Sequence, residues 1–315
     1  MGHYSISQRR WHLWHSDSFI RIRIKSQLMK IGLIGTGLMG QALSHHLLAE
    51  NQPLVVFNRS LEKCDELKAR GAAVATSAQA LVEQSDICLL FLSDAKAISS
   101  VLDDIDDAVF KNCLLIQMGT IAPEESRSLA QRVRATGGRY LECPVLGSLP
   151  EAGSGKLILM AAGKKTDYKA ALPLLELIGH EPQYIGDIGQ GATVKLAMNQ
   201  LIAGLTASFA LSLALVEKEG IATEQFMKIV RDSALYAPTF DKKLSRMIER
   251  DFSEPNFPTK HLAKDTRLFL SVANELGLDT SALKGIELLL QKALDMGLDN
   301  TDYSALMAAV SPKES

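Results

Sequence analysis

Hydrophobic residues along the chain form short uninterrupted runs that alternate with longer amphipathic stretches. Runs of strand length occur at residues 30–35, 53–58, 86–92, 113–118 and 138–143. The stretches between them, such as LMGQALSHHLLAE and APEESRSLAQRVRATG, place apolar residues at helical spacing. Buried strands that alternate with helices predict an α/β fold, a doubly wound parallel sheet covered by helices on both faces. Further apolar runs at 156–163 and 182–186 are expected to extend the sheet.

The pattern changes near residue 190, after which helical spacing continues and the strand-length runs stop. We therefore predict a sheet-containing domain over residues 29–190 and an all-α domain over residues 191–315. The apolar stretch from Leu196 to Val216 has 21 residues and approaches the length of a membrane span. Because asparagine, glutamine, threonine and serine interrupt it, we interpret it as a long buried interdomain helix and expect no membrane contact.

Residues 1–28 differ in composition from the rest of the chain. They carry five arginine or lysine residues against one acid, Asp17, and both tryptophans of the protein. The apolar strand that begins at Met29 is a common start for an α/β domain. We expect residues 1–28 to lie outside the fold. A basic targeting segment is the alternative, although the continuous apolar core of a secretory signal is missing.

Composition narrows the class of protein. A length of 315 residues with 47% hydrophobic and 22% charged residues is typical of a soluble protein with two domains. The net charge of -2 argues against nucleic acid as a partner. The four cysteines are widely spaced and form no C-x-x-C motif, so we expect reduced core thiols, a cytoplasmic location and no metal site.

The segment GLIGTGLMG follows the first strand and opens the first helix. Its glycines have the G-x-G-x-x-G spacing, in which the first makes a tight turn, the second lets a pyrophosphate approach and the third packs the helix on the strand. The free N–H groups of a helix start favour the phosphates. A tight strand–helix turn is the alternative. We predict a Rossmann-type dinucleotide site formed by Gly35, Thr36, Gly37, Leu38, Met39 and Gly40.

The end of the second strand indicates which dinucleotide is preferred. A carboxylate at this position holds the ribose 2′-hydroxyl of NAD and repels the 2′-phosphate of NADP. This chain has Asn58, Arg59 and Ser60 instead. Because a guanidinium binds phosphate well, we predict that NADP is preferred and that NAD is possible. A solvated arginine at a helix start is the alternative.

Loops at the carboxyl ends of later strands complete the predicted site. Ser93 and Thr120 follow two of these strands, and either side chain can act as a cofactor ligand or as a helix cap. The segment 142–157 is rich in proline, glycine and serine and is predicted to be a functional loop. Its backbone N–H groups can cradle an anion.

The segment GQGATVKLAMNQ places a charged residue, Lys195, at the head of the long apolar helix. Burial and the positive end of the helix dipole both predict a lowered pKa for this amine. Such an amine can carry a proton to or from a carbonyl oxygen. Asn199, one turn on, shares the same helix face and can hold that oxygen or orient the lysine. A lysine whose ammonium reaches solvent is the alternative.

Six ordered segments carry a family resemblance over residues 29–312: GLIGTGLMG, NRS, MGTIAP, CPVLGS, GQGATVKLAMNQ and KHLAKDTRLFL. The chain resembles the β-hydroxyacid dehydrogenases, which include 3-hydroxyisobutyrate dehydrogenases and glyoxylate/succinic semialdehyde reductases and share the dinucleotide domain of 6-phosphogluconate dehydrogenase. The resemblance implies a homodimer or homotetramer acting on a small molecule. It further implies Lys195 as the catalytic acid/base, Asn199 as a catalytic and substrate-contacting residue, Thr120 and Lys264 at the cofactor, and Asp265 at the substrate.

One position departs from the family pattern. The substrate loop of the family reads P-V-S-G, whereas this chain has Leu146 in place of the serine, followed by Gly147 and Ser148. Losing a hydrogen bond to a charged group costs about 1.5–3 kcal/mol. We therefore expect an NAD(P)-dependent oxidoreductase that interconverts a small semialdehyde or keto acid and its hydroxyacid. The alternatives are a reductase of a non-carboxylate carbonyl or imine and a non-catalytic nucleotide-binding protein.

Overall fold

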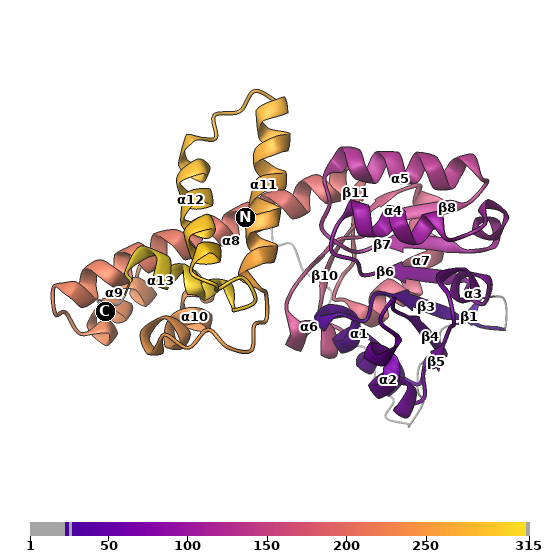
Figure 1. The fold of residues 1–315 in the computed structure, drawn as a ribbon, viewed down its shortest axis with the longest axis horizontal. Coiled ribbons are helices and arrows are strands. Elements are labelled where there is room, and N and C mark those ends of the chain that lie inside the picture. The colour runs from indigo at the N-terminus through magenta and orange to yellow at the C-terminus, as the bar shows by residue number, and fades with distance from the viewer. Residues whose placement is uncertain (1–22, 25–26, 313–315) are drawn as a thin grey trace, which may run out of the picture.

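The computed structural model describes residues 23–24 and 27–312, which form an α/β part and a helical part (Figure 1). One helix, α8 (Gln190–Lys218), starts against the sheet and runs out through the helical part. Two short strands, β1 (Arg23–Ile24) and β2 (Gln27–Leu28), pair antiparallel and stay separate from the main sheet. The extension predicted over 1–28 lies mostly outside the described residues.

The main sheet has nine strands, and eight of them are ordered β11-β10-β8-β7-β6-β3-β4-β5, with β9 paired to β10. The strands from β3 to β8 in this sheet run parallel, whereas β10 is antiparallel to both β8 and β9. The prediction of a doubly wound sheet with two added strands is confirmed. The strands are β3 (Ile31–Ile34), β4 (Leu54–Phe57), β5 (Ala73–Val74), β6 (Ile87–Leu90), β7 (Leu114–Gln117), β8 (Arg139–Glu142), β9 (Val145–Leu146), β10 (Ile158–Gly163) and β11 (Gln183–Gly186).

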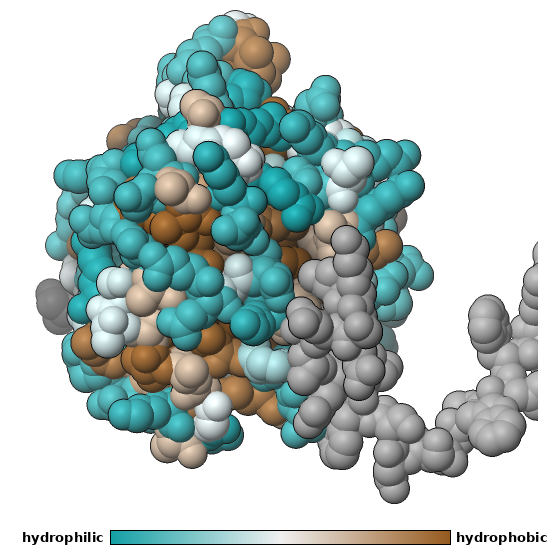
Figure 2. Space-filling model, turned by 90° about the vertical axis from the view of Figure 1, so that its right-hand side faces the viewer, coloured by the Kyte–Doolittle hydropathy of each residue, from teal (hydrophilic) through white to brown (hydrophobic). Residues whose placement is uncertain are grey.

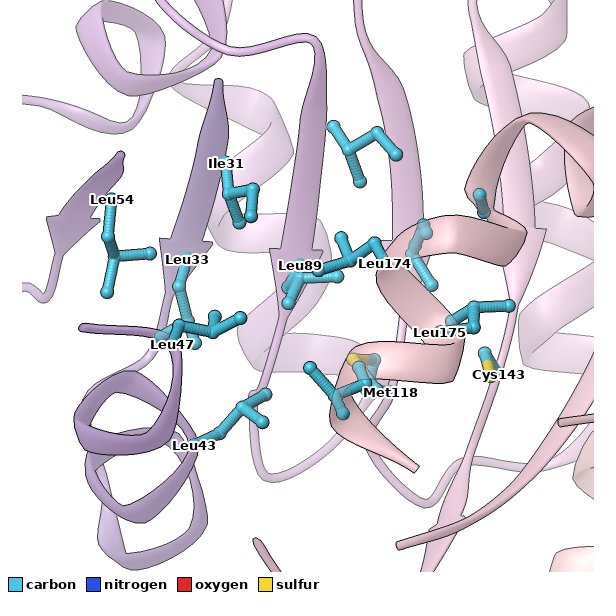
Figure 3. Close-up of a cluster of buried hydrophobic side chains, with 14 of the residues drawn as sticks. Ile31, Leu33, Leu43, Leu47, Leu54, Leu89, Met118, Cys143, Leu174 and Leu175 are labelled. Carbon is cyan, nitrogen blue, oxygen red and sulfur yellow. The ribbon is translucent and has the colours of Figure 1, made fainter. Parts of the chain in front are cut away.

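Two hydrophobic cores lie on opposite faces of this sheet. Leu43 and Leu47 of α1 (Leu38–Ala49) share one core with Leu174 of α7 (Lys165–Ile178), as Figure 3 shows. The other core lies under α3 (Ala78–Glu83), α4 (Ala95–Asp103) and α5 (Pro123–Ala135). Fully burying a leucine contributes about 1.5–3 kcal/mol. These layers hold the strand ends in place for the site described below.

Short elements fill the connections of the α/β part. They are η1 (Leu61–Cys64), α2 (Asp65–Ala69), η2 (Asp107–Asn112) and α6 (Leu149–Gly153). The prediction of a loop over 142–157 is therefore wrong in part, because this segment holds β9 and α6. A capping interaction between Ser148 and Glu151 explains why a helix starts there. All four cysteines are buried and unpaired, as predicted.

The helical part is built around α8. Its partners are α9 (Thr223–Asp232), α10 (Pro238–Glu249), α11 (Thr259–Glu275), α12 (Ser281–Asp295), η3 (Tyr303–Ala305) and α13 (Leu306–Val310). By length and hydropathy α8 is a candidate membrane span, and 44% of its most apolar window is buried in the structure. Buried core helices of soluble proteins meet the same criteria. Figure 2 shows the α/β end of the molecule, where hydrophilic residues predominate.

Candidate functional site

The glycine loop lies at the switch point of the sheet, where the chain returns from β5 to β6 beside β3. Gly35 has a φ of +102°, and its N–H donates to the main-chain oxygen of Phe57 at 3.0 Å. A Cβ on Gly40 would collide with the oxygen of Gly35, whereas a Cβ on Gly37 would meet open space. This open side, at the uncapped start of α1, fits a bound pyrophosphate.

The residues between the glycines face different ways. Thr36 is buried, with its Oγ1 3.8 Å from the Sγ of Cys64. Leu38 is exposed and Met39 is half-buried. Thr36 therefore packs on the protein side of the loop. A ligand on the solvent side would meet main-chain N–H groups and the side chain of Leu38.

A pocket of about 160 Å³ opens beside this loop. It gathers the predicted residues from the ends of β3, β4 and β6, and its lining consists of Ile34, Gly35, Phe57, Asn58, Arg59, Ser60, Lys63, Leu92, Ser93, Ala97 and Val101. The Nδ2 of Asn58 donates to the oxygen of Ser60 at 3.0 Å and fixes the turn that presents Arg59. No carboxylate lines the pocket among the described residues.

Lys63 is a pocket residue that the sequence interpretation missed. It adds a second cation beside Arg59. The spacing of four residues from Arg59 was an available signal, because a helical turn after the strand returns the chain to the same side.

Lys264 of α11 joins the helical part to the strand ends. Its Nζ donates to the main-chain oxygens of Ser93 at 2.8 Å and Thr120 at 2.6 Å, and lies 2.9 Å from Oδ1 of Asp265. The structure thus brings together three residues that the sequence predicted for the cofactor site.

Neither Ser93 nor Thr120 caps a helix. Asp94 caps α4 by accepting the N–H of Ala97 at 2.8 Å, and the hydroxyl of Ser93 donates to that same carboxylate. At the start of α5, Glu125 accepts the N–H of Ala122 at 2.7 Å. Both predicted residues therefore lie at the strand ends without a capping role.

Lys195 is 9% exposed near the N-terminus of α8. Burial lowers the pKa of its amine to about 8, with Lys264 adding to the shift and Asp265 opposing it. The predicted direction of the shift is confirmed, and burial is its main cause. A group with this pKa exchanges protons near neutral pH, as an acid/base catalyst must.

Asn199, one turn further along α8, forms a buried pair with Asp265 of α11. The Nδ2 of Asn199 donates to Oδ2 of Asp265 at 2.6 Å. The remaining oxygen of the amide, Oδ1, is buried without a hydrogen-bond partner in the described structure. Because buried polar atoms are rarely left unpaired, this oxygen marks a place for a donor from a ligand or from Lys195.

The predicted substrate loop differs from its expected arrangement at Ser148. Both its N–H and its hydroxyl donate to Oε2 of Glu151, at 2.7 and 2.6 Å. These bonds lower the pKa of Glu151 to about 2, and Lys242 of α10 lies 3.6 Å from its other oxygen. The N–H of Ser148 is therefore already used, contrary to its predicted role as an anion donor.

Leu146 is half-buried, and Gly147 has a φ of +140°. The sequence interpretation also missed Glu151, although the order Ser-x-x-Glu is the signature of a capping box. Among the described residues, no group of three or more histidine, cysteine or acidic side chains is placed to hold a metal ion.

Comparison with known proteins agrees with this geometry. Residues 30–186 match the NAD-binding domain of 6-phosphogluconate dehydrogenase, and residues 189–310 match the NAD-binding domain of NADP-dependent 3-hydroxyisobutyrate dehydrogenase. Glyoxylate/succinic semialdehyde reductase 1 of Arabidopsis thaliana is 33% identical over 285 residues, which cover 90% of this chain and 98% of that protein. The chain belongs to the β-hydroxyacid dehydrogenase family.

Two further proteins are similar to this chain, one in fold and one in sequence. The Mycobacterium tuberculosis 3-hydroxyisobutyrate dehydrogenase, solved with L-serine, has a TM-score of 0.81 at 21% identity and covers 90% of this chain and all of its own. The cytokine-like nuclear factor N-PAC of Xenopus tropicalis is 26% identical over 89% of this chain and 53% of its own length. The β-hydroxyacid dehydrogenases are NAD(P)-dependent oxidoreductases, and the glycine loop and pocket of this member fit a nicotinamide dinucleotide.

Proposed function

We propose that this protein is an NADPH-preferring reductase that converts a small semialdehyde or keto acid to its hydroxyacid, or catalyses the reverse reaction, with Lys195 as the general acid/base. The buried amine of Lys195, with a pKa of about 8, carries the proposal. Its surroundings support it, because Asn199 is paired with Asp265 and the neighbouring Lys264 donates to the main chain at two strand ends.

A reduced nicotinamide, when bound, supplies the hydride. In the proposed step the carbonyl carbon accepts the hydride while the ammonium of Lys195 donates a proton to the carbonyl oxygen. The product is the alcohol, and the neutral amine regains its proton from solvent. The unpaired Oδ1 of Asn199 is an acceptor, so it orients the lysine or accepts the product hydroxyl. The hydrogen bond to Asp265 uses one of the two N–H donors of the amide, the group that the sequence interpretation gave the role of holding the carbonyl oxygen.

The lining of the pocket supports the preference for NADP. Arg59 and Lys63 supply two positive charges, Ser60 supplies a hydroxyl, and no acid faces them among the described lining residues. A 2′-phosphate would gain charge-assisted hydrogen bonds here that a ribose hydroxyl cannot make.

The substrate loop favours a carbonyl compound whose binding depends less on a carboxylate group of its own. Leu146 removes a hydroxyl donor, and Glu151 holds both donors of Ser148 while presenting an ionised carboxylate of its own. We therefore keep a non-carboxylate carbonyl as the second candidate substrate. Because the chain is also similar to the nuclear factor N-PAC, we keep nucleotide binding without turnover as the third candidate.

A homodimer or homotetramer is supported by the exposed face of α8. Leu201, Leu205, Leu211 and Leu215 all lie exposed on this one helix. A run of exposed leucines along a helix is typical of a surface that another subunit covers.

The test is NADPH and NADH oxidation with a panel of semialdehydes, keto acids and simple aldehydes, comparing the protein with a Lys195→Met variant. Methionine matches the four-atom stem of the lysine, with sulfur in place of one methylene, and lacks the amine. We expect turnover with NADPH by the unchanged protein and a loss of at least 100-fold in the variant. Equal turnover by both proteins would falsify the role of Lys195. NADPH binding without turnover of any substrate would favour the non-catalytic alternative.

A further inference from the structure

Glu142, the last residue of β8, is a fully buried acid that the mechanism above does not use. Its Oε1 accepts three main-chain N–H groups from the start of α8, those of Gly189 at 2.8 Å, Gly191 at 2.8 Å and Ala192 at 3.2 Å. Its Oε2 accepts the hydroxyl of Ser126, which lies 3.1 Å from that of Tyr140. Every oxygen of this carboxyl group is thus held by the protein.

The two glycines that precede Lys195 are explained by this carboxyl group. Gly189 has a φ of +97°, which turns its N–H toward Glu142. A Cβ on Gly191 would lie 2.5 Å from the main-chain oxygen of Met160 and 3.1 Å from Oε1 of Glu142. The Gly-x-Gly segment therefore lets the first turn of α8 seat closely on β8 and β10, with an internal carboxylate occupying its free N–H groups.

We propose that Glu142 is a positioning residue for Lys195, clamping the first turn of α8 to the end of β8. The inference rests on the proposed role of Lys195. Glu142 directly precedes the segment that leads to Leu146. One side chain therefore fixes the position of the first turn of α8, the helix that carries Lys195, at the point where the substrate loop begins. An error of about 1 Å in such an arrangement can lower a rate 100-fold.

The clamp also places an acid at the N-terminal end of the helix that carries Lys195. The N-terminus of α8 is the positive end of its dipole, and a negative charge there offsets it. Other charged groups near this end are Lys264 and Asp265 of α11, Arg127 of α5, which approaches Gly189, and Asp187, whose main chain is hydrogen-bonded to Gln190. Burial raises the pKa of Glu142, while the hydrogen bonds from Ser126 and the three N–H groups oppose the shift. Removing its charge would lower the pKa of Lys195 further.

Two substitutions separate charge from position. Glu142→Gln keeps an oxygen for the three N–H groups and removes the charge. Gly191→Ala keeps Glu142 and pushes the first turn of α8 away from β10. Asp106→Asn is the matched control, because Asp106 caps η2, an element that carries no group of the clamp or of the predicted site, by accepting the N–H of Ala108 at 2.8 Å. The measurements are kcat and KM with NADPH and an aldehyde from pH 6 to 10, the Kd for NADPH, and thermal unfolding.

We expect Gly191→Ala to lower kcat by about 10-fold or more with the Kd for NADPH within twofold, because the helix start moves while the glycine loop stays. Glu142→Gln should shift the alkaline limb of the kcat profile to lower pH by roughly half a unit. Asp106→Asn should change neither kcat nor the pH limb. If Glu142→Gln does not fold, Ser126→Ala, which frees only Oε2, replaces it and should lower kcat while leaving the Kd for NADPH unchanged.

The inference fails if folded Glu142→Gln, or its replacement, and Gly191→Ala both keep the kcat and the pH limb of the unchanged protein. A fall in thermal stability alone also overturns it, because that result describes an ordinary helix cap. The Lys195→Met variant measured in parallel separates the two proposals. If that variant is inactive while the Glu142 variants are normal, only the present inference is wrong. If Lys195→Met is active, the proposed function is wrong.

Discussion

The side-chain amide of Asn199 donates a hydrogen bond of 2.6 Å to the carboxylate of Asp265, joining α8 to α11 in a buried contact. A carboxylate only accepts, so the contact fixes which way the amide faces. The oxygen of Asn199 is then directed elsewhere and has no partner in the described structure. Lys195 lies one turn earlier on the same helix face, so this oxygen is suited to hold its ammonium.

The rate should depend on pH through Lys195. Its pKa of about 8 means that the ammonium is present below that pH and the neutral amine above it. We therefore expect kcat/KM for reduction to fall as the pH rises through about 8, and kcat/KM for oxidation to rise over the same range. Profiles from pH 6 to 10 in both directions check this. A pH profile whose apparent pKa stays at the ordinary lysine value, above 10, would contradict this prediction.

Cofactor preference should depend on Arg59. Replacing it with aspartate removes a phosphate donor and adds a carboxylate that can bind the ribose hydroxyls, so the ratio of kcat/KM for NADPH to NADH should fall about 10-fold to 100-fold. Lys63→Ala should lower the same ratio to a smaller extent. Arg70→Asp, a change at an arginine outside the pocket, is the control. An unchanged ratio in Arg59→Asp would show that the 2′-phosphate binds elsewhere.

The substrate loop should respond to restoring its hydroxyl. Leu146→Ser adds back a donor for a carboxylate, so KM for semialdehydes that carry a carboxylate should improve about 10-fold. Glu151→Gln should add to the effect by removing the ionised group that holds Ser148. Uncharged aldehydes of similar size serve as the comparison, since their KM should not improve. If both substrate classes respond equally, the loop does not bind the carboxylate.

The stability of the helical part should depend on one buried ion pair. Lys243 of α10 donates to both oxygens of Asp302 at 2.8 Å, and both side chains are almost fully buried. Asp302→Ala leaves an uncompensated charge and should lower the free energy of unfolding by about 3–5 kcal/mol. The double variant with Lys243→Met should recover much of this loss. Denaturant unfolding measures both, and equal losses in the single and double variants would rule out a charge effect.

The exposed leucines of α8 should control assembly. Placing glutamate at Leu211 and Leu215 puts charges on the apolar face and should convert an oligomer to monomers, as measured by sedimentation. Leu276→Glu, at an exposed leucine at the end of α11, should leave the assembly unchanged. A protein that is monomeric before substitution would exclude the proposed oligomer.

Much of the architecture could be predicted from residue order because the signals are local. The seven apolar runs became β3, β4, β6, β7, β8, β10 and β11, and the glycine spacing marked the loop at Gly35. The strands β5 and β9 were missed because two residues each show no periodicity. Their pairing depends on neighbouring strands that are distant in the sequence.

The residues of the site were visible in the sequence, but their pairings were not. The lowered pKa of Lys195 follows from a lysine heading an apolar helix, which the sequence shows directly. The contacts of Lys264 with Ser93 and Thr120 span more than 140 residues, and those of Glu142 with α8 span nearly 50. Hydrogen bonds at such separations depend on how the sheet and helices pack, so tertiary structure alone decided which donors remain free for a ligand.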